Sequence, residues 1–585
     1  MILNALVDYY EALAARGAIA RPGWGKTKIS FALELDGDGK LLRALPLSSQ
    51  PEDGKKPVPR TMELPAPVKR TVGIAANFLW DNSAYLLGTD GKGKPERAKD
   101  CFAAAKELHL SLLQELDDPF ARAICRFFES WEPEKAAEEP ALSDSLEDIL
   151  KGVNLTFLFD GVFPDKNGAL CRAWQEHYDG GGDGEKMRCL VTGEKVVPEK
   201  THPAIKNVVG AQSSGAALVS FNADAFCSYE RSQNLNAPVG KYAAFAYTTA
   251  LNSLLSDKEH VRRFGDTTVV FWAEDAEPAY QAAFAGFLDG GGDKLTPGEL
   301  KSCMDDLAHG RLSRWQDVPL HAQNHFYILG LAPNAARLSV RFFLRGEFGK
   351  FAENMQKHYE DIDIVSDNRS KFDTMPLWAL LRETVNMNSH SKDALPQMAG
   401  DTLRSILSGQ SYPATLYQQT QLRIRAEHEV TRGRAGIIKA YLTRLQNNEK
   451  FREALTVKLN EETDYQPYIL GRLFSVLEGL QQAANPGINT TIKDKYFTSA
   501  GATPAVVFPT LLNLAEKHLR KLDGGKRVYW AKQVTELTSR VTESYPAHHN
   551  LYDQGIFQLG YYHQTQKRFE KKDKADTAET IKEEN

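Results

Sequence analysis

The spacing of hydrophobic and polar residues in the first 150 positions predicts a mixture of helices and strands. Apolar residues recur at helical intervals from Ile2 to Leu13. Two segments of alternating polarity then flank a short run of Asp and Gly, an order typical of a β-hairpin. The elements predicted in this N-terminal α/β part, residues 1–150, are a helix from Ile2, strands 31–35 and 41–47 around the turn 36–39, and helical spacing over 98–129.

Residues 151–378 continue as an α/β region. Its most informative stretch is a strand, a short Asn/Pro turn, a second strand and then a helix. A hairpin that leads into a helix in this way indicates an RNA-recognition-like or ferredoxin-like unit. The predicted strands are 155–159, 187–191, 267–272, 326–331 and 337–344, and the predicted helices are 242–255 and 348–359.

After about residue 378 the strand patterns stop and helical spacing continues to residue 569. Gly, Pro and Asn occupy the joints, as expected between the helices of a bundle. The tail 570–585 is charged and poor in apolar residues, which predicts disorder. The fold class is therefore α+β, with an N-terminal mixed α/β region followed by an all-α C-terminal helical bundle. The predicted helices of this bundle, residues 379–569, are 397–407, 414–429, 433–446, 468–484, 503–522, 526–542 and 551–569.

Composition places the chain among ordinary globular proteins of the cytoplasm. Hydrophobic residues make up 42% of the 585 positions and charged residues 25%. The N-terminus lacks the basic segment of a secretory signal, and no run approaches the roughly 20 apolar residues that cross a bilayer. The six cysteines form no C-x-x-C pair, which predicts reduced thiols.

The distribution of charge is more informative than its total. The net charge is −5, which at first argues against a nucleic-acid-binding protein. Residues 401–585, however, carry 26 Lys and Arg against 21 Asp and Glu. A cationic C-terminal part on an acidic protein indicates a localised surface for a polyanion.

Motifs that would identify an enzyme are incomplete. The segment Gly23–Thr27 lacks the first glycine of a phosphate-binding loop, where Ala20 stands instead. His321 and His325 have helical spacing, but the Glu that a zinc hydrolase needs is absent between them. The segment Ala211–Gly215 is one residue away from the G-x-S-x-G nucleophile elbow. We therefore expect no catalysis, metal or cofactor, while a serine hydrolase centred on Ser213 stays an open alternative.

Four stretches are dense in Asn, Gln, Ser and small residues within sequence that otherwise looks folded. Asn and Gln present a hydrogen-bond donor and an acceptor together, which suits base edges, while Gly and Ala allow close approach. The same residues also cap ordinary turns. The four stretches are Gly73–Tyr85, His202–Gly215, Ser220–Tyr229 and Asn386–His390.

Several blocks spread over nearly the whole chain support a more specific interpretation. They are Ile2–Tyr10, Cys189–Gly193, His202–Phe226, Phe326–Arg341, the helix pair Arg423–Lys439, and Tyr468–Ala484 with Thr503–Leu522. Together these blocks resemble the family of large subunits of the type I-C CRISPR Cascade, a crRNA-guided surveillance complex. The resemblance rests on many blocks and is far more specific than any of the short motifs.

The resemblance implies a non-catalytic role. A large subunit of this family contacts the crRNA 5′ end and the Cascade backbone subunits, and it recognises a short protospacer-adjacent motif (PAM) in double-stranded DNA. It then helps to open the duplex, holds the displaced strand and docks a recruited helicase-nuclease. Readout from the minor groove depends on polar and small residues, which the four stretches supply. Pairing with the guide reads the rest of the target.

Site residues are assigned from these stretches and from the C-terminal cations. Phe78 and Trp80 are the predicted wedges against a base step. Cations along the bundle are predicted to contact phosphates of the displaced strand, with a solvated helix face as the alternative. The residues predicted near the PAM duplex are Asn77, Phe78, Trp80, Asn82, Lys206, Asn207, Gln212, Ser213 and Ser214, and the predicted phosphate contacts are Arg472, Lys517, Arg520, Lys521, Lys526 and Arg527.

In the family that this chain resembles, the C-terminal helices are also made separately as small subunits from an internal start. The last methionine is Met398, well before the helix near Tyr468. We therefore predict a non-ATG start near Val457, which gives a small-subunit-like product of about 130 residues, a normal domain size. A scaffold that uses its helices only for protein contacts is the remaining alternative.

Overall fold

The structure, a computed structural model, describes most of the chain and divides into two compact units. The described residues are 1–49, 58–68, 70, 73–91, 93–179, 184–291, 296–366, 372–386, 388–390, 393–446 and 449–569. Unit 1 consists of Met1–Lys206 and Ser214–Ser253, and unit 2 of Asn207–Ser213 and Leu254–Asn585. The boundaries predicted after residues 150 and 378 fall inside these units and stay predictions, and the tail 570–585 lies outside the described residues.

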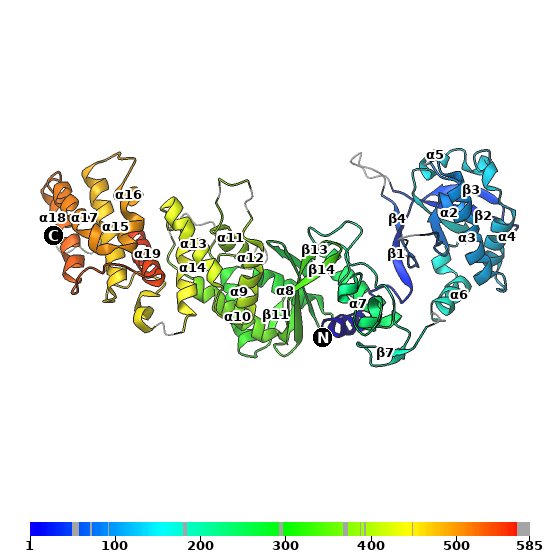
Figure 1. The fold of residues 1–585 in the computed structure, drawn as a ribbon, viewed down its shortest axis with the longest axis horizontal. Coiled ribbons are helices and arrows are strands. Elements are labelled where there is room, and N and C mark those ends of the chain that lie inside the picture. The colour runs from blue at the N-terminus through cyan, green and yellow to red at the C-terminus, as the bar shows by residue number, and fades with distance from the viewer. Residues whose placement is uncertain are drawn as a thin grey trace, which may run out of the picture. The chain divides into compact units, whose positions relative to one another are not determined.

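Unit 1 contains a four-stranded sheet with the order β3-β2-β6-β5, of which β2 and β3 are labelled in Figure 1. β2 and β6 are parallel, while the other neighbours are antiparallel. Helix α4 packs on β2 and β6 and contributes Phe120, Phe127 and Phe128 to the core. The described elements of unit 1 are α1 (Ile2–Ala15), β1 (Trp24–Ile29), β2 (Phe31–Leu35), β3 (Leu41–Pro46), β4 (Arg60–Pro65), β5 (Trp80–Asn82), α2 (Ser83–Leu86), α3 (Pro95–Leu113), α4 (Pro119–Ser130), α5 (Leu146–Ile149), β6 (Asn154–Phe159), α6 (Gly168–Asp179), β7 (Met187–Arg188), β8 (Lys195–Val196) and most of α7 (Lys241–Ser256).

The hairpin between β2 and β3 forms where the alternating pattern predicts it. Asp36 closes the turn, because its carboxylate accepts hydrogen bonds from the N–H groups of Asp38 and Lys40 at 3.0 and 2.8 Å. The helical spacing over 98–129 divides into α3 and α4. Asp118 caps the second helix, and Pro119 occupies its first position.

Unit 2 begins with a second four-stranded antiparallel sheet, in the order β14-β13-β10-β9. The strands therefore lie in the order that they follow along the chain, and the predicted hairpin leads into a helix, α10. Alternate residues of β10 and β13, including Phe271 and Phe326, pack against Phe284 of α8 and Phe348 of α10. The elements of this part are β9 (Val261–Phe264), β10 (Thr267–Ala273), α8 (Pro278–Leu288), α9 (Pro297–Ala308), β11 (Ser313–Trp315), β12 (Val318–Leu320), β13 (His325–Asn334), β14 (Arg337–Glu347) and α10 (Phe348–Ile362).

The rest of unit 2 is helical, as the sequence predicts, and α15 and α19 form its centre. These two helices approach closely where Gly471 faces Gly560. A Cβ added at Gly560 would lie 3.0 Å from the Tyr468 carbonyl carbon, so the crossing requires glycine. The helices are α11 (Leu377–Arg382), α12 (Pro396–Leu407), α13 (Ala414–Glu427), α14 (Arg432–Thr443), α15 (Gln466–Ala484), α16 (Ile492–Ala502), α17 (Pro504–Leu519), α18 (Gly524–Ser539) and α19 (Leu551–Lys567). Among the helices that the structure describes, none has the length and apolar character needed to cross a membrane.

Candidate nucleic-acid interface

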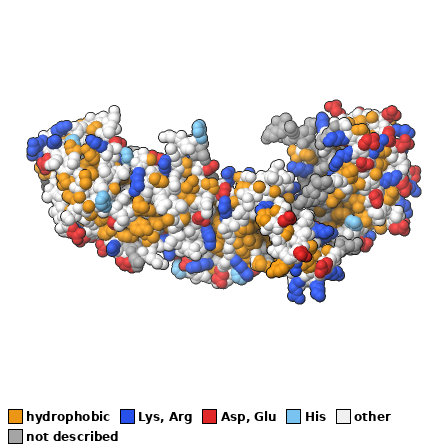
Figure 2. Space-filling view, viewed as in Figure 1, with side chains coloured by type: hydrophobic (Ala, Val, Ile, Leu, Met, Phe, Trp, Pro, Cys, Tyr) orange, Lys and Arg blue, Asp and Glu red, His pale blue; other side chains and the backbone are white. Residues whose placement is uncertain are grey.

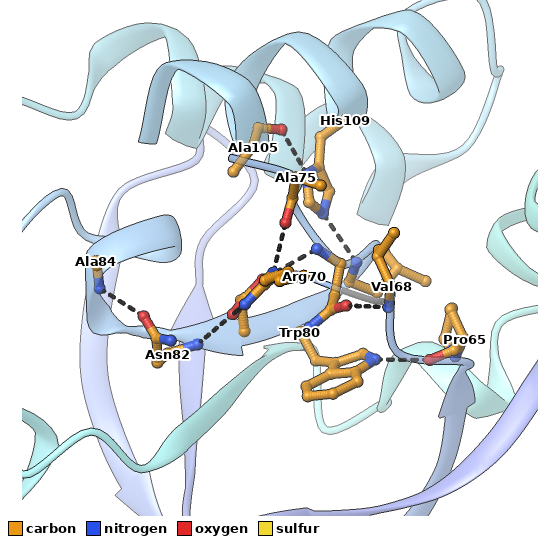
Figure 3. A network of polar contacts seen from close by, with 12 residues as sticks. Pro65, Val68, Arg70, Ala75, Trp80, Asn82, Ala84, Ala105 and His109 are labelled. Carbon is orange, nitrogen blue, oxygen red and sulfur yellow. Dashed lines mark hydrogen bonds and ion pairs between the residues drawn. The ribbon is translucent and has the colours of Figure 1, made fainter. Parts of the chain in front are cut away.

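The turn that precedes β5 is organised by the buried carboxylate of Asp81, and its neighbours Arg70, Trp80 and Asn82 are labelled in Figure 3. This carboxylate accepts hydrogen bonds from the backbone N–H groups of Asn77 and Asn82, each at 2.9 Å. Both terminal nitrogens of Arg70 pair with it as well, and Arg70 Nε donates to the Ala75 carbonyl oxygen at 2.6 Å. Because the carboxylate bonds to both ends of the turn, the backbone between them is held in one conformation.

The polar side chains of this turn are used inside the protein. Asn77 Oδ1 accepts from the backbone N–H of Val68 at 2.9 Å. Trp80 Nε1 donates to the Pro65 carbonyl oxygen at 2.8 Å, and the side chain of Asn82 caps helix α2. These atoms satisfy buried backbone groups, which would be costly to leave unpaired.

The remaining aromatic of the turn, Phe78, is stacked on Trp174 with a centroid distance of 5.6 Å. The next residue, Leu79, has a left-handed φ of 67° and donates its N–H to His109 Nε2 at 2.8 Å. His109 Nδ1 lies 2.7 Å from the Ala105 carbonyl oxygen and is the donor there, because Nε2 is the acceptor. Complete burial lowers the pKa of His109 to about 4, so the imidazole is neutral at pH 7.

These positions correct part of the sequence-based assignment. Asn77, Phe78 and Trp80 are 4%, 1% and 5% exposed, so none of them can contact a base or act as a wedge in this conformation. Among the described residues around this turn, the cation that reaches the surface is Arg70, which was not among the predicted site residues. The one feature of the sequence that points to Arg70 is its position next to Lys69, as a pair of cations in an otherwise apolar and proline-rich stretch.

The second predicted region, the loop between residues 205 and 216, is closed at its base by a β-bridge. Ile205 and Ala216 exchange backbone hydrogen bonds of 2.9 and 2.8 Å. The N–H of Lys206 donates to Asn252 Oδ1 at 2.7 Å. Gly215 has a φ of +96°, and a Cβ there would lie 2.9 Å from the Ile205 carbonyl oxygen. The bridge and the glycine together fix where the loop leaves the fold.

This loop exposes its polar side chains, in contrast to the turn before β5. The chain passes from unit 1 to unit 2 after Lys206 and returns after Ser213. Within unit 2, Val208 is buried and the N–H of Val209 donates to Thr268 Oγ1 of β10 at 3.2 Å. The exposed residues of the loop include all five that were predicted to lie near DNA: Lys206, Asn207, Gln212, Ser213 and Ser214.

The loop does not resemble a hydrolase site in this conformation. A catalytic serine needs an imidazole within hydrogen-bond reach. In the described part of the chain no histidine is hydrogen-bonded to Ser213. Among the described residues, no three His, Cys, Asp or Glu side chains are grouped so that they could hold a metal ion.

A third region, the cation cluster of α17 and α18, brings five of the six predicted phosphate contacts together. Figure 2 shows several Lys and Arg side chains at this end of unit 2. All five side chains are exposed, and none forms an ion pair with a described residue. The members of the cluster are Lys517, Arg520 and Lys521 at the end of α17, and Lys526 and Arg527 within the first four residues of α18.

Helix stability explains only the α17 half of this cluster. Cations are favourable at the C-terminus of a helix, where they offset the negative end of its dipole. Lys526 and Arg527 lie at the opposite end, the N-terminus of α18, where the dipole disfavours positive charge. No acidic residue occupies the first turn, and Asp523 precedes the helix without a capping hydrogen bond from its side chain. A bound polyanion would neutralise both the mutual repulsion and the unfavourable dipole.

The sixth predicted phosphate contact, Arg472, is not on the surface. It lies on α15, is 2% exposed, and donates from Nε to Gln564 Oε1 of α19 at 3.0 Å. A buried guanidinium bonded within the α15–α19 pair cannot reach a phosphate. Its flanking sequence, Leu470-Gly471 and Leu473-Phe474, already indicates a core-facing turn of helix.

The cluster also contains residues that the sequence analysis missed. Val528 and Tyr529 are 69% and 56% exposed, and the side chain of Lys532 is exposed one turn further along α18. An exposed ring among cations can stack on a base while the cations bind the backbone. The sequence contains a signal for these residues, because two cations directly precede Val528 and Tyr529 at the start of the predicted helix 526–542.

The family model described as CRISPR-associated protein (Cas_Csd1) matches residues 6–569, which covers both units. No curated protein matches the sequence.

Proposed function

Because the chain belongs to the Cas_Csd1 family of CRISPR-associated proteins, we propose that it is the non-catalytic large subunit of a type I-C Cascade. In this role it contacts crRNA and the Cascade backbone subunits in the cytoplasm. It recognises the PAM in double-stranded target DNA, helps to unwind the target, holds the displaced strand and docks a helicase-nuclease. Small subunits made from its own C-terminal region join the same complex.

The observation that carries this proposal is the cation cluster of α17 and α18. Five exposed cations without acidic partners, two of them at an unfavourable helix end, favour a polyanionic ligand over a purely structural role. The exposed ring of Tyr529 favours a single strand, whose bases are free to stack, over a closed duplex. The displaced strand of an opened target fits both requirements.

The exposed loop between residues 205 and 216 supports the PAM-reading part of the proposal. Its tip presents Asn, Gln, Ser and Lys side chains from a base fixed by a β-bridge. Exposed side chains of these kinds offer donors and acceptors to the minor groove. Gln212 is the strongest single choice, because its amide carries both a donor and an acceptor and is exposed.

The test is binding of the assembled crRNA complex to duplexes that match the guide and differ only in the PAM. The Gln212→Ala variant is compared with wild type, and Gln114→Ala, which removes an exposed Gln of unit 1 outside this loop, is the matched control. We expect wild type and the control to prefer the correct PAM. The Gln212→Ala variant should lose about 1–3 kcal/mol of that preference.

Two outcomes would contradict parts of the proposal. If the wild-type complex binds all PAM variants equally, the PAM-reading role is wrong. If the wild-type complex discriminates between PAM variants, and the Gln212→Ala, Ser213→Ala and Ser214→Ala variants all discriminate equally well, this loop does not read the PAM. A complex whose DNA binding is insensitive to salt would instead favour a protein scaffold.

A further inference from the structure

The exposed stretch between residues 222 and 233 of unit 1 ends in a turn with an unusual backbone. Tyr229 and Glu230 have φ values of +54° and +59°. The N–H of Arg231 donates to the Ser228 carbonyl oxygen at 3.1 Å, so these two residues occupy the central positions of a closed four-residue turn. Two consecutive left-handed residues are the arrangement of a type I′ turn, which is usually built from Asn and Gly. A residue with a Cβ, and a bulky one above all, is disfavoured there.

One side chain, that of Asn236, holds this turn in place. Its Oδ1 accepts from the N–H of Ser228, and its Nδ2 donates to the carbonyl oxygens of Arg231 and Gln233, each at 2.8 Å. These bonds fix both ends of the turn to a single residue outside it. The unfavourable backbone is therefore maintained by the surrounding loop rather than by the preferences of Tyr229 or Glu230.

This turn places the aromatic ring of Tyr229 in solvent. Tyr229 is 93% exposed, the highest exposure among the large hydrophobic side chains that the structure describes. In the described part of the chain its ring packs on no other aromatic side chain and its hydroxyl has no partner. An unfavourable backbone conformation, held by three hydrogen bonds, thus displays a ring that contributes nothing to the core.

We propose that Tyr229 is a stacking platform for one unpaired nucleobase of the nucleic acid that the assembled complex binds. The inference rests on the proposed function, because it requires a crRNA or an opened DNA strand. Every base has a flat face that an exposed tyrosine can stack on, and a single ring is sufficient for that contact. Exposed Arg231, two positions along, offers a guanidinium for the adjoining backbone.

The neighbourhood of Tyr229 favours a base over a protein surface. Energetically important aromatics in protein interfaces lie at the centre of a patch from which surrounding residues exclude water. Here the flanking residues Ser228, Glu230, Arg231 and Ser232 are exposed and polar. A single ring with polar neighbours gives a protein partner little area to bury, whereas it is sufficient for a base.

The experiment uses the assembled crRNA complex and measures its affinity for a matched duplex and its crRNA content. If the ring stacks, Tyr229→Phe keeps wild-type affinity, while Tyr229→Ala and Tyr229→Leu both weaken binding about tenfold. Asn236→Ala, which releases the turn but keeps the ring, weakens binding by a smaller factor. Glu230→Gly, which relieves the left-handed backbone at the neighbouring position, leaves binding unchanged.

Photo-crosslinking then identifies the strand. Complexes that carry 5-iodouracil either in the crRNA or in the DNA are irradiated, and a crosslinked peptide that contains Tyr229 supports stacking and names the strand. The inference is overturned if Tyr229→Ala binds like wild type, or if it only reduces the amount of subunit incorporated, which would indicate a protein contact. A wild-type complex that binds neither crRNA nor DNA would refute the proposed function, and this inference with it.

Discussion

His109 shows how one buried side chain can set the conformation of a turn and its dependence on pH. Nε2 must be unprotonated to accept the N–H of Leu79, so protonation would place two donors against each other. Burial lowers the pKa of His109 to about 4, from an ordinary value near 6.5. At pH values between about 4 and 6.5, His109 is therefore protonated in the unfolded state and neutral in the folded state. The contribution of His109 to stability therefore falls as the pH decreases from about 6.5 towards 4.

This prediction is checked by hydrogen exchange of the peptide that spans Asn77–Asn82 in the full chain. Between pH 7 and pH 5 the protection of this peptide should fall by about 2 kcal/mol, after correction for intrinsic exchange rates. In His109→Gln the amide can still accept the Leu79 N–H and does not titrate, so protection should be nearly independent of pH. Equal pH dependence in both proteins would show that His109 does not control the turn.

The same turn explains why the site residues were only partly predictable. The composition of Gly73–Tyr85 is compatible with contacts to bases and equally with the capping of turns. It does not reveal whether an Asn amide bonds to a ligand or to its own chain, as Asn77 does with Val68. That distinction depends on contacts between residues distant in sequence, such as Phe78 with Trp174. The loop at Gln212 has a similar composition, yet its polar side chains are exposed, so composition alone does not separate the two cases.

At the scale of elements, the two periodicities predicted many of the helices and strands, but not α6, α8 and α9 or the strands β1, β4 and β5. The hairpin of β13 and β14 followed by α10 is confirmed, because a period of two changes to helical spacing at Phe348. Helix α16 was missed, since only four of its residues are buried and its apolar positions give little periodicity. The division between α3 and α4 was missed because the helical spacing of apolar residues continues across it. Asp118 and Pro119 mark the start of a new helix there, but this local signal lies within the longer helical pattern.

The α17–α18 pair carries a prediction about salt. If the cation cluster contacts phosphates of the displaced strand, each contact releases counterions, and affinity falls with salt in proportion to their number. Replacing Lys517 and Lys526 with Ala should weaken binding of the assembled complex to every target sequence. The slope of log affinity against log salt should become shallower by about 2.

The matched control for this measurement is Lys40→Ala with Lys458→Ala, two exposed lysines outside the cluster. Removing the same charge there should leave the slope near its wild-type value. A shallower slope in both double variants would mean that net charge, rather than the cation cluster, governs binding. An unchanged slope in Lys517→Ala with Lys526→Ala would show that α17 and α18 do not contact the strand.

At the scale of the whole molecule, the structure bears on where a separate C-terminal product can begin. Val457 is 38% exposed and lies between the buried Ala454 and the start of α15. A product that begins there keeps α15–α19 together, including the close crossing at Gly471. Met398 lies within α12, is 3% exposed, and belongs to a helix that packs on β10. A start at Met398 would separate α12 from that sheet, whereas a start at Val457 leaves out α12 and separates α19 from α13 and α14.

We therefore expect expression of the full coding sequence to yield a second product of about 130 residues that begins at position 457, with methionine in place of Val457. Intact mass and the N-terminal peptide of this product check the position. Changing the Val457 codon to a synonymous codon that cannot initiate should remove the product while leaving the full chain unchanged, and the same change at Val476 should have no effect. A short product that begins at Met398 would contradict the prediction. It would also mean that α12 folds without the strands β9 and β10 that it packs on here, because its buried face would then need another partner.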